Sequence, residues 1–584
     1  MPVLDWIGKK AVVNHHREVP YRLVHCDGAR SAGDPEAGNL LVHGDNLEAL
    51  KALLPYYAGK VKAIYIDPPY NTGNENWVYN DNTNSPEIRS WIGRVVGKEA
   101  DDLSRHDKWL CMMYPRLRLL KDFLTADGAF FASIDANEMS NFEFLVKEIF
   151  GGFKIITIPV VNNMKGRNDK GYISTCHEYL IMAAGKDFVS AGLPLTQQQQ
   201  AVFKYADEEG YKFDLRDLRR RGGDDDGAKR VNLSFPIYKD PKSNNLSIDA
   251  IDGWIEIIPL KSDGSRGRWR WGKTRVEKFI KTLVPSYVKK NKKWNISYKV
   301  YLDSNRESLI FSDDPSDYDD DDYDDETGDP IERTTKPKSF WWGPELSTDN
   351  AGKALKDIFG GTKPFEYPKS VSLIQKILHL VGDKNALILD SFAGSGTTGH
   401  AVLDLNRRDD GNRKFILVEM EGAIAQDITA KRLELVIDGY DRGGDITAPV
   451  DGLGGGFRFC TLGEALFDEF GDIAAAVSFP DLAAHVFFAE TGAPIPARAD
   501  SGSSLIGLHD RKAVYLLFEP AVQGVPREAA GNVLTPDALS HLPNPPEGFT
   551  GQRIVFAEGC TVSSERLKAE AVIFKQIPYQ IEGI

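Results

Sequence analysis

A buried strand that ends at two consecutive prolines constrains this chain more than any other feature. The apolar, β-rich run Val61–Ile66 predicts the strand, and Asp67, Pro68, Pro69 and Tyr70 follow it directly. Because proline has no N–H and a fixed φ, neither the strand nor a helix continues through the pair. The strand therefore ends in a stiff turn where a carboxylate, a backbone carbonyl and an aromatic ring can line a pocket.

Such a pocket suits a flat group that carries an amine, such as a nucleobase with an exocyclic amino group. Asp67 and the Pro68 carbonyl can accept the two amine hydrogens, which makes the nitrogen more nucleophilic. Tyr70 can stack on the face of a base that has been extruded from a duplex. A simpler interpretation is a Pro-Pro turn after a core strand, with Asp67 as a helix cap. A catalytic role requires a group donor bound elsewhere in the chain.

A glycine-rich turn between a strand and a helix predicts that donor site. The strand 385–389 is followed by the turn 390–398, which lacks the third glycine of a pyrophosphate fingerprint and the lysine of a P-loop. A second strand, 415–419, ends in an acid, which suits the two ribose hydroxyls of an adenosine. Together these features favour S-adenosylmethionine over a nicotinamide nucleotide or ATP. The predicted donor contacts in this region are Asp390, Phe392, Ala393, Gly394, Ser395, Gly396, Thr397 and Glu419.

Two shorter stretches extend the predicted donor site. Asp45 and Asn46 stand between a short strand and a helix; either they only cap the helix, or Asp45 lies beside the donor's adenine. Lys369 precedes an amphipathic helix that begins at about residue 371. It marks either a capped helix entrance or a wall around the methionine end of the donor.

The order of the predicted elements indicates an α/β fold. Apolar strands alternate with amphipathic helices after residue 39, and the alternation returns between about residues 371 and 435. This pattern predicts a Rossmann-like parallel sheet with helices on both faces. The polar stretch 1–38 predicts an N-terminal arm. A glycine-rich joint, 452–456, precedes strand-like runs that predict a small α/β domain over 450–584.

Composition limits the kinds of site that the chain can carry. With 584 residues, of which 42% are hydrophobic, the chain is long enough for two or three globular domains. The five cysteines are scattered and form no CxxC pair, so we expect reduced thiols rather than disulfides or a zinc site. No apolar run approaches the length of a membrane span, and no signal peptide is recognisable. A cytoplasmic location follows as an expectation.

Three clusters of basic residues predict a DNA-binding surface despite the net charge of −14. The run Asp313–Glu326 alone carries ten carboxylates, so the rest of the chain is close to neutral. One basic run is usually only a solvated face, but three within about eighty residues favour nucleic acid. The predicted DNA contacts are Arg219, Arg220, Arg221, Arg268, Trp269, Arg270, Lys289, Lys290, Lys292 and Lys293.

These motifs, in this order, resemble the β-class amino DNA methyltransferases over about residues 39–435. In that class the catalytic motif comes first, a target-recognition region follows and the donor motif is last. Further stretches resemble the modification subunits of type III restriction–modification systems: Tyr65 to Gly73, Gly44 to Glu48, His177-Glu178 and Asn232 to Ile237.

The resemblance implies roles for individual residues. Asp67, Pro68, Pro69 and Tyr70 would be catalytic; Phe392, Gly394 and Gly396 would line the donor site, and Glu419 would hold the ribose. Asp rather than Ser at position 67 favours adenine N6 over cytosine N4. His177 and Glu178 are expected to have a structural hydrogen-bonding role, because no partner stands at metal-ligand spacing.

The resulting prediction is a sequence-specific adenine-N6 DNA methyltransferase that flips its target base and needs no metal. By resemblance it would form a homodimer, pair with a helicase–nuclease subunit and act in a bacterial or archaeal cytoplasm. Cytosine-N4 methylation remains an alternative, as does a DNA-recognition subunit that mainly directs a nuclease. The predicted domains are an arm (1–38), a catalytic half (39–199), an α+β target-recognition region (200–345, acidic loop 313–329), a donor half (346–449) and a dimerisation or docking domain (450–584).

Overall fold

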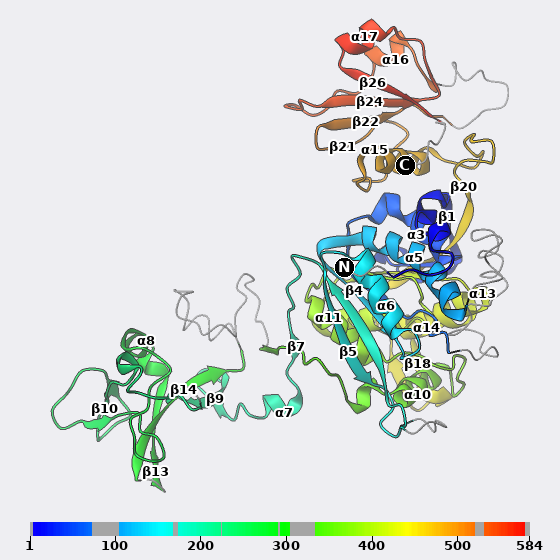
Figure 1. The fold of residues 1–584 in the computed structure, drawn as a ribbon. Helices are drawn as coiled ribbons and strands as arrows, with labels where there is room; N and C mark the ends of the chain where they lie inside the picture. The colour runs from blue at the N-terminus through cyan, green and yellow to red at the C-terminus, as the bar shows by residue number, and fades with distance from the viewer. Residues whose placement is uncertain are drawn as a thin grey trace. The chain divides into compact units, whose positions relative to one another are not determined.

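The computed structural model describes residues 4–72, 104–166, 173–222, 225–289, 292–303, 333–519 and 531–577 (Figure 1). Two compact units divide the chain: residues 192–337 form one, and the segments on either side of them form the other. The sequence predicted a target-recognition region over 200–345. Lys290, the acidic run Asp313–Glu326 and the loop 313–329 lie outside the described residues.

A nine-stranded sheet forms the centre of the larger unit, in the order β1-β20-β2-β17-β16-β3-β4-β6-β5. The strands, in that order, are Arg22–Gly33, Gly456–Ala465, Leu40–His43, Lys414–Glu419, Leu387–Asp390, Val61–Ile66, Leu124–Ile134, His177–Ala184 and Lys154–Val161. Strands β20 to β4 run parallel, whereas β6 is antiparallel to both of its neighbours and β1 is antiparallel to β20. The predicted α/β architecture is confirmed, with a mixed rather than fully parallel sheet.

Successive strand residues face opposite sides of the sheet, and each side carries helices. In β17, Ile416 and Val418 belong to a core shared with α3, α5 and α6. On the other side, Phe415 and Leu417 lie close to Gly399 of α12, next to Leu433 of α14. The helices that pack in these two groups are α3 (Asn46–Tyr57), α5 (Arg105–Phe123), α6 (Met139–Ile149), α11 (Val371–Val381), α12 (Thr397–Asp409) and α14 (Lys431–Asp438).

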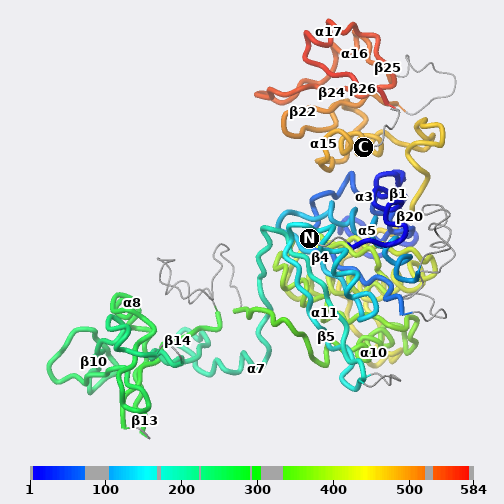
Figure 2. Tube along the Cα trace, in the orientation of Figure 1, coloured from blue at the N-terminus to red at the C-terminus, as the bar shows by residue number. Residues whose placement is uncertain are grey.

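The first 38 residues are not an arm. Strand β1 pairs antiparallel with β20 along the edge of the main sheet, with Arg22 opposite Ala465 at one end and Gly33 opposite Gly456 at the other (Figures 1 and 2). Polar residues are tolerated there because much of β1 is exposed. Strand β20, which the sequence placed in the C-terminal domain, is likewise part of the main sheet.

The expectation of reduced thiols is also wrong for one pair. Cys26 of β1 and Cys460 of β20 are directly opposite, with a Cα–Cα distance of 3.9 Å, and form a disulfide. They are 434 residues apart in the sequence, so no local pattern reveals that they meet. Cys111, Cys176 and Cys560 are free.

After β20 the chain forms a smaller α/β layer that belongs to the same unit. Helix α15 (Phe479–Thr491) packs on strands β21 (Leu505–His509) and β22 (Lys512–Leu516), and β24 (Gln552–Ala557) and β26 (Val572–Gln576) continue the sheet in parallel. Short pieces complete it: β23 (Val533–Leu534), β25 (Gly559–Cys560), α16 (Pro536–Ser540) and α17 (Ser564–Ala569). No helix in the described ranges has both the length and the apolar character needed to cross a membrane.

The smaller unit, coloured mostly green in Figure 1, is an α+β structure with its own core. Its main sheet is antiparallel, in the order β13-β14-β9-β8. These strands are Leu283–Val288, Lys293–Tyr301, Lys212–Asp217 and Tyr205–Ala206. A second small sheet and one helix pack with them: β10 (Ile237–Lys239), β11 (Leu246–Ser247), β12 (Ile255–Ile257) and α8 (Lys273–Lys278).

Candidate active site

The two predicted motifs meet because β3 and β16 are neighbouring parallel strands. Ile64 pairs with Leu389, so the turns that follow both strands leave the sheet at the same edge. A cavity that is partly open to solvent lies between these turns. Its lining residues are Tyr65, Asp67, Phe365, Tyr367, Lys369, Asp390, Phe392, Ala393, Gly394, Ser395, Thr397 and Thr398.

Asp67 belongs to a buried cluster of opposite charges. The Lys369 ammonium lies 3.0 Å from Asp67 Oδ1 and 3.4 Å from Glu178 Oε2. It donates a hydrogen bond of 2.7 Å to the Tyr70 hydroxyl, which in turn donates to Glu178 Oε2 at 2.9 Å. Among the described residues, the buried Asp67 Oδ1 has this ion pair but no well-directed hydrogen bond. The loop 67–71, here named the catalytic loop for its predicted role, therefore presents an acceptor with unused hydrogen-bonding capacity beside the cavity.

Burial and charge act in opposite directions within this cluster. Burial raises the pKa of Asp67; Lys369 counteracts the effect and Glu178 adds to it. Burial disfavours the Lys369 ammonium, but Asp67 and Glu178 outweigh it and raise the pKa of Lys369. The lysine therefore remains charged. The sequence placed Lys369 beside the donor; the structure places its ammonium among the side chains of the catalytic loop.

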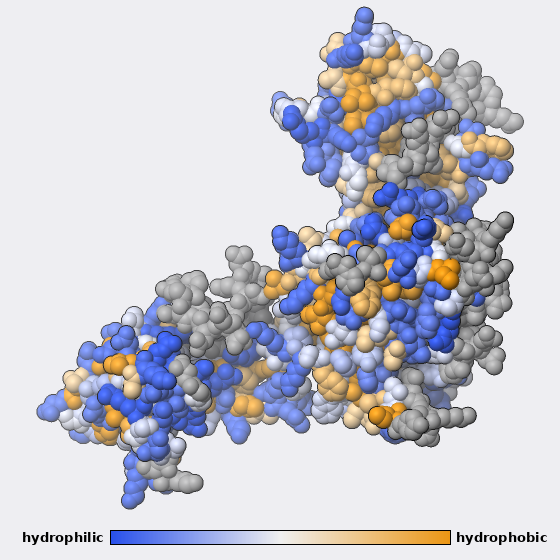
Figure 3. All heavy atoms as spheres, viewed as in Figure 1, coloured by the Kyte–Doolittle hydropathy of each residue, from blue (hydrophilic) through white to orange (hydrophobic). Residues whose placement is uncertain are grey.

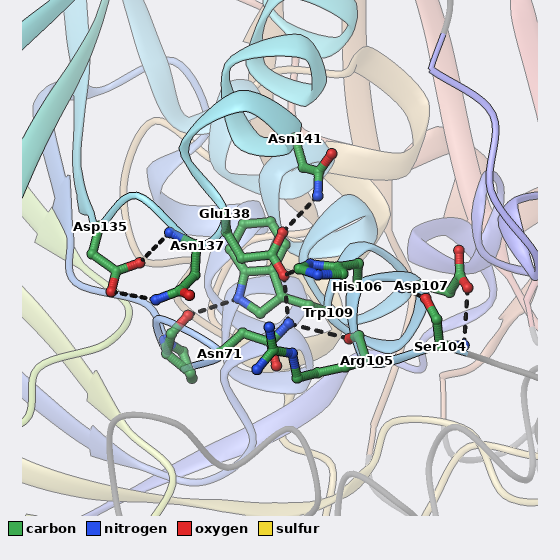
Figure 4. A network of polar contacts seen from close by, with 11 residues as sticks. Asn71, Ser104, Arg105, His106, Asp107, Trp109, Asp135, Asn137, Glu138 and Asn141 are labelled. Atoms are coloured by element: carbon green, nitrogen blue, oxygen red, sulfur yellow. Dashed lines mark hydrogen bonds and ion pairs between the residues drawn. The ribbon is translucent and has the colours of Figure 1, made fainter. Parts of the chain in front are cut away.

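A second network, made of polar contacts, also holds the catalytic loop (Figure 4). Trp109 Nε1 donates to the Pro69 carbonyl at 2.7 Å. Asn71 has the positive φ of 55°, and its carboxamide donates to the fully buried Glu138 carboxylate and to the Arg105 carbonyl. Glu138 also contacts His106 Nδ1 at 2.6 Å. Because φ > 0 is costly for a residue other than glycine, these contacts are what keeps the loop in this shape.

The glycine-rich turn is held by side chains from the segment after β17. Gly394 and Gly396 both have positive φ, of 50° and 76°, which glycine adopts without strain. Thr429 Oγ1 donates to the Gly394 carbonyl at 2.5 Å. Arg432, which is 1% exposed, donates to the Ser395 carbonyl at 3.1 Å and to Thr397 Oγ1 at 2.9 Å. These contacts thus hold the backbone of the turn in one conformation around the cavity.

Two buried acids lie at the ends of the donor strands. Burial raises the pKa of Asp390 to about 7, although Thr398 Oγ1 and the Phe392 amide donate to its two oxygens. Burial raises the pKa of Glu419 to about 8. The Glu419 carboxylate accepts the Gly394 N–H at 2.8 Å and therefore shapes the turn directly. Glu419 is not among the residues that line the cavity.

Asp45 and Asn46 act on the site through other residues. Asp45 caps α3, since its Oδ1 accepts the amides of Leu47 and Glu48, and its Oδ2 accepts Arg116 Nη2 at 2.9 Å. Asn46 donates to the Ser391 carbonyl at 3.3 Å and so ties α3 to the donor turn. Arg116, 2% exposed, contacts both residues and was missed by the sequence reasoning. Neither Asp45 nor Asn46 lines the cavity.

The predicted DNA contacts all lie in the smaller unit but differ in exposure. Arg221, Lys289 and Lys292 are exposed, and the two lysines flank the turn of the β13–β14 hairpin. Hydrophilic residues predominate on the face of this unit seen in Figure 3. Of the other described members, Arg219, Arg220, Arg270 and Lys293 are half-buried, whereas Arg268 and Trp269 are buried.

The prediction that Trp269 contacts DNA is wrong. Its side chain is 1% exposed in the core of the smaller unit, and its Nε1 donates to the Phe235 carbonyl at 2.7 Å. The indole therefore cannot stack on a base without unfolding the unit. Its neighbour Arg268 is also buried, at 9% exposure. Alternation along an extended segment places every second side chain inside, which a cluster of basic residues in the sequence does not show.

Comparison with known proteins identifies the family to which this chain belongs. A family model described as "DNA methylase" matches residues 61–431, a range that includes both turns of the cavity. The chain belongs to the DNA methylase family. The sequence-based resemblance to amino DNA methyltransferases is thereby confirmed.

Several curated relatives of this DNA methylase are subunits of restriction–modification systems. The chain is 33% identical over 440 residues to the type III restriction–modification enzyme EcoPI Mod subunit of Escherichia phage P1, covering 72% of this chain and 64% of that subunit. It is 29% identical over 413 residues to the type II methyltransferase M.KpnI of Klebsiella pneumoniae, covering 68% of this chain and 87% of M.KpnI. The aligned region thus spans less than two thirds of the EcoPI Mod subunit.

Among solved structures, M1.HpyAVI is similar over 68% of this chain and 99% of its own, with 14% identity and a TM-score of 0.28. That score is too low to support an argument about either fold or function.

The structure adds residues that were not among the predicted site residues. Thr398, Tyr65, Phe365 and Tyr367 line the cavity, and Glu178 contacts the catalytic loop. Glu178 had been singled out only for structural hydrogen bonding. Its position at the start of β6, beside β4, was the available signal, because that end of β6 lies at the same edge as the end of β3.

Proposed function

We propose that this DNA methylase transfers a methyl group from S-adenosylmethionine to the N6 amine of an adenine extruded from double-stranded DNA. The catalytic residues are Asp67, Pro68, Pro69 and Tyr70. The proposed setting is the modification subunit of a type III restriction–modification system, acting in the cytoplasm as a homodimer with a helicase–nuclease partner. The names of the relatives EcoPI Mod and EcoP15I Mod support the type III modification-subunit part of this proposal.

The observation that carries the proposal is the open acceptor of Asp67 beside the glycine-rich turn. Among the described residues Asp67 Oδ1 is buried without a directed hydrogen bond, and it shares one cavity with Gly394 and Ser395. A buried acceptor that lacks a donor is costly, and an amine from the substrate would satisfy it. Both reactants would then be held within one cavity, which favours direct transfer between them.

The residues around the cavity fit a cationic donor. Asp390 is 2% exposed, and among the described residues it accepts hydrogen bonds only from the Phe392 amide and the Thr398 hydroxyl. A buried carboxylate with neutral partners favours a nearby positive charge. Phe392, Gly394, Ser395 and Thr397 would hold the donor, with Asp45, Asn46, Lys369 and Glu419 supporting that site.

The chain supplies orientation and charge to the reaction. When bound, S-adenosylmethionine supplies a methyl group activated by its sulfonium. Asp67 Oδ1 and the Pro68 carbonyl accept the two amine hydrogens and return electron density to the nitrogen, while Tyr70 stacks on the base. Asp67, whose pKa burial raises, is placed to receive the proton that the methylated amine loses.

Binding of DNA is assigned to the smaller unit. The exposed residues Arg221, Lys289 and Lys292 are suited to phosphate contacts, and a two-stranded ribbon such as β13–β14 fits the major groove. Adenine is preferred over cytosine because Asp rather than Ser occupies position 67 and because of the Mod relatives.

The test is incubation of the purified protein with labelled S-adenosylmethionine and unmethylated genomic DNA, followed by digestion to nucleosides. Label in N6-methyladenine that disappears in Asp67→Ala supports the proposal. Label in N4-methylcytosine would keep the reaction and change the base. Retained donor binding with no label on DNA would instead favour a recognition subunit that directs a nuclease.

A further inference from the structure

Glu178 is a buried carboxylate that reaches the catalytic loop from another strand. It lies at the start of β6, is 5% exposed and pairs through its backbone with Val160 of β5. One of its oxygens, Oε2, accepts the Tyr70 hydroxyl at 2.9 Å and lies 3.4 Å from Lys369 Nζ. The sequence predicted only a structural hydrogen bond for this residue.

The cluster holds two carboxylates and one ammonium. Lys369 Nζ is 3.0 Å from Asp67 Oδ1, within reach of Glu178, and 4.7 Å from the centroid of the Tyr70 ring. Among the described residues, its directed hydrogen bond goes to the Tyr70 hydroxyl, whereas its contact with Asp67 is an ion pair. The ammonium therefore neutralises charge at Asp67 Oδ1 through an ion pair and not through a directed hydrogen bond.

We propose that Glu178 is a positioning residue that shares the charge of Lys369 with Asp67 and so keeps Asp67 Oδ1 open for the target amine. This inference rests on the proposed methyl transfer. Without the Glu178 charge, Asp67 would be the only anion in contact with Lys369. In a site of low dielectric the ammonium would then move fully onto Asp67, and the two groups would close into a directed hydrogen bond.

Tyr70 connects the Lys369 ammonium to the Glu178 carboxylate. Its hydroxyl accepts from Lys369 and donates to Glu178, so it links the two charged groups. The same two contacts fix the ring that is to stack on the base. Loss of Glu178 would therefore affect both the acceptor and the stacking partner of the substrate.

The first experiment compares single-turnover methyl transfer in wild type, Glu178→Gln, Lys369→Met and the double variant, with labelled S-adenosylmethionine and unmethylated DNA. Glutamine keeps the size of the side chain and an acceptor for Tyr70 but removes the charge. We expect Glu178→Gln to lower the transfer rate by about tenfold or more while donor affinity stays unchanged. Above neutral pH the double variant should be faster than Glu178→Gln, because the ammonium that blocks Asp67 is gone.

The pH profile separates this role from a purely structural one. Asp67 must be ionised, and the groups facing it are Lys369, Glu178, Tyr70, Tyr65 and Asp390. Burial raises the pKa of Asp67, Lys369 lowers it and Glu178 raises it. The acid limb of the rate should therefore move to lower pH in Glu178→Gln and to higher pH in Lys369→Met.

Glu490→Gln is the matched control. This glutamate has a side-chain exposure of 6% and forms ion pairs with Lys512 and Lys575, which belong to the C-terminal region and not to the cavity. Removing its charge should therefore change neither the rate nor the acid limb. Should Glu178→Gln fail to fold, Glu178→Asp, which keeps the charge, should retain the wild-type acid limb.

An unchanged rate in Glu178→Gln would overturn the inference. So would a reduced rate with an unmoved acid limb, or a double variant no faster than Glu178→Gln. Failure of the wild type itself to label DNA would instead contradict the proposed function.

Discussion

Trp109 Nε1 donates a hydrogen bond to the Pro69 carbonyl at 2.7 Å. Trp109 is fully buried in α5, and its ring meets Phe142 of α6 edge to face. The indole therefore engages the Pro69 carbonyl, which is not one of the two acceptors, Asp67 and the Pro68 carbonyl, that we propose for the substrate amine.

Trp109→Phe should slow methyl transfer by about tenfold, because the loop loses the bond that sets its orientation. The ring remains, so the free energy of unfolding should fall by only about 1 kcal/mol. Trp6→Phe is the control, since Trp6 Nε1 donates to Cys111 Sγ, away from the loop. Equal rates for Trp109→Phe and wild type, measured by single-turnover labelling, would contradict the assigned role.

Asp390 makes both stability and donor affinity depend on pH. Its pKa is raised by burial from 3.8 to about 7, so the folded state binds more protons than the unfolded state between these values. The free energy of unfolding should therefore fall as pH rises through this window, by at most about 1.4 kcal/mol per unit. Asp390→Asn, whose carboxamide oxygen can still accept the Thr398 hydroxyl, should lose this component in thermal melts at several pH values.

Affinity for S-adenosylmethionine should rise with pH towards about 7, because a cationic ligand favours the ionised form of Asp390. Calorimetry in two buffers should detect proton release on binding by wild type and less release by Asp390→Asn. The same proton release in both proteins would show that another group is responsible.

The Cys26–Cys460 disulfide predicts the number of free thiols. Three of the five cysteines should react with a thiol reagent under denaturing, non-reducing conditions, and all five after reduction. A bond that joins residues 434 apart restricts the unfolded chain, so reduction should lower the free energy of unfolding by about 2–4 kcal/mol. Cys26→Ser/Cys460→Ser should melt like the reduced wild type and not respond to reductant; five reactive thiols without reduction would refute the bond.

The exposed basic residues of the smaller unit should control the salt dependence of DNA binding. Replacing Arg221, Lys289 and Lys292 by alanine should weaken binding and reduce the slope of log K against log salt by about one for each phosphate that is no longer neutralised. Alanine at the exposed Lys186, Lys431 and Lys568 of the larger unit, which makes the same change in net charge, should leave that slope unchanged.

Trp269→Ala tests the placement of Trp269 in the core. It should lower the melting temperature of the smaller unit, because it removes a large buried ring. A normal melt combined with a specific loss of DNA affinity would instead mean that the indole faces DNA.

The sequence by itself was sufficient to predict the strands that end at Asp67 and Asp390, the helix after the glycine-rich turn and the α/β class. These features depend on local periodicity and on residues with restricted backbones, such as Pro68, Pro69 and Gly396, so neighbours in the chain determine them. The same logic predicted strand-like runs at 513–518, 553–557 and 571–577 in the C-terminal region, where the structure has β22, β24 and β26.

Only the tertiary structure decided which side chains reach those strand ends. Glu178, Trp109 and Lys369 contact the catalytic loop from 108, 40 and 299 residues away, through the order of strands in the sheet and the packing of α5. Strand β1 and the Cys26–Cys460 bond likewise depend on where β20 returns to the sheet edge. No periodicity in the chain encodes such contacts, because they arise from the burial of whole faces and not from local backbone preference.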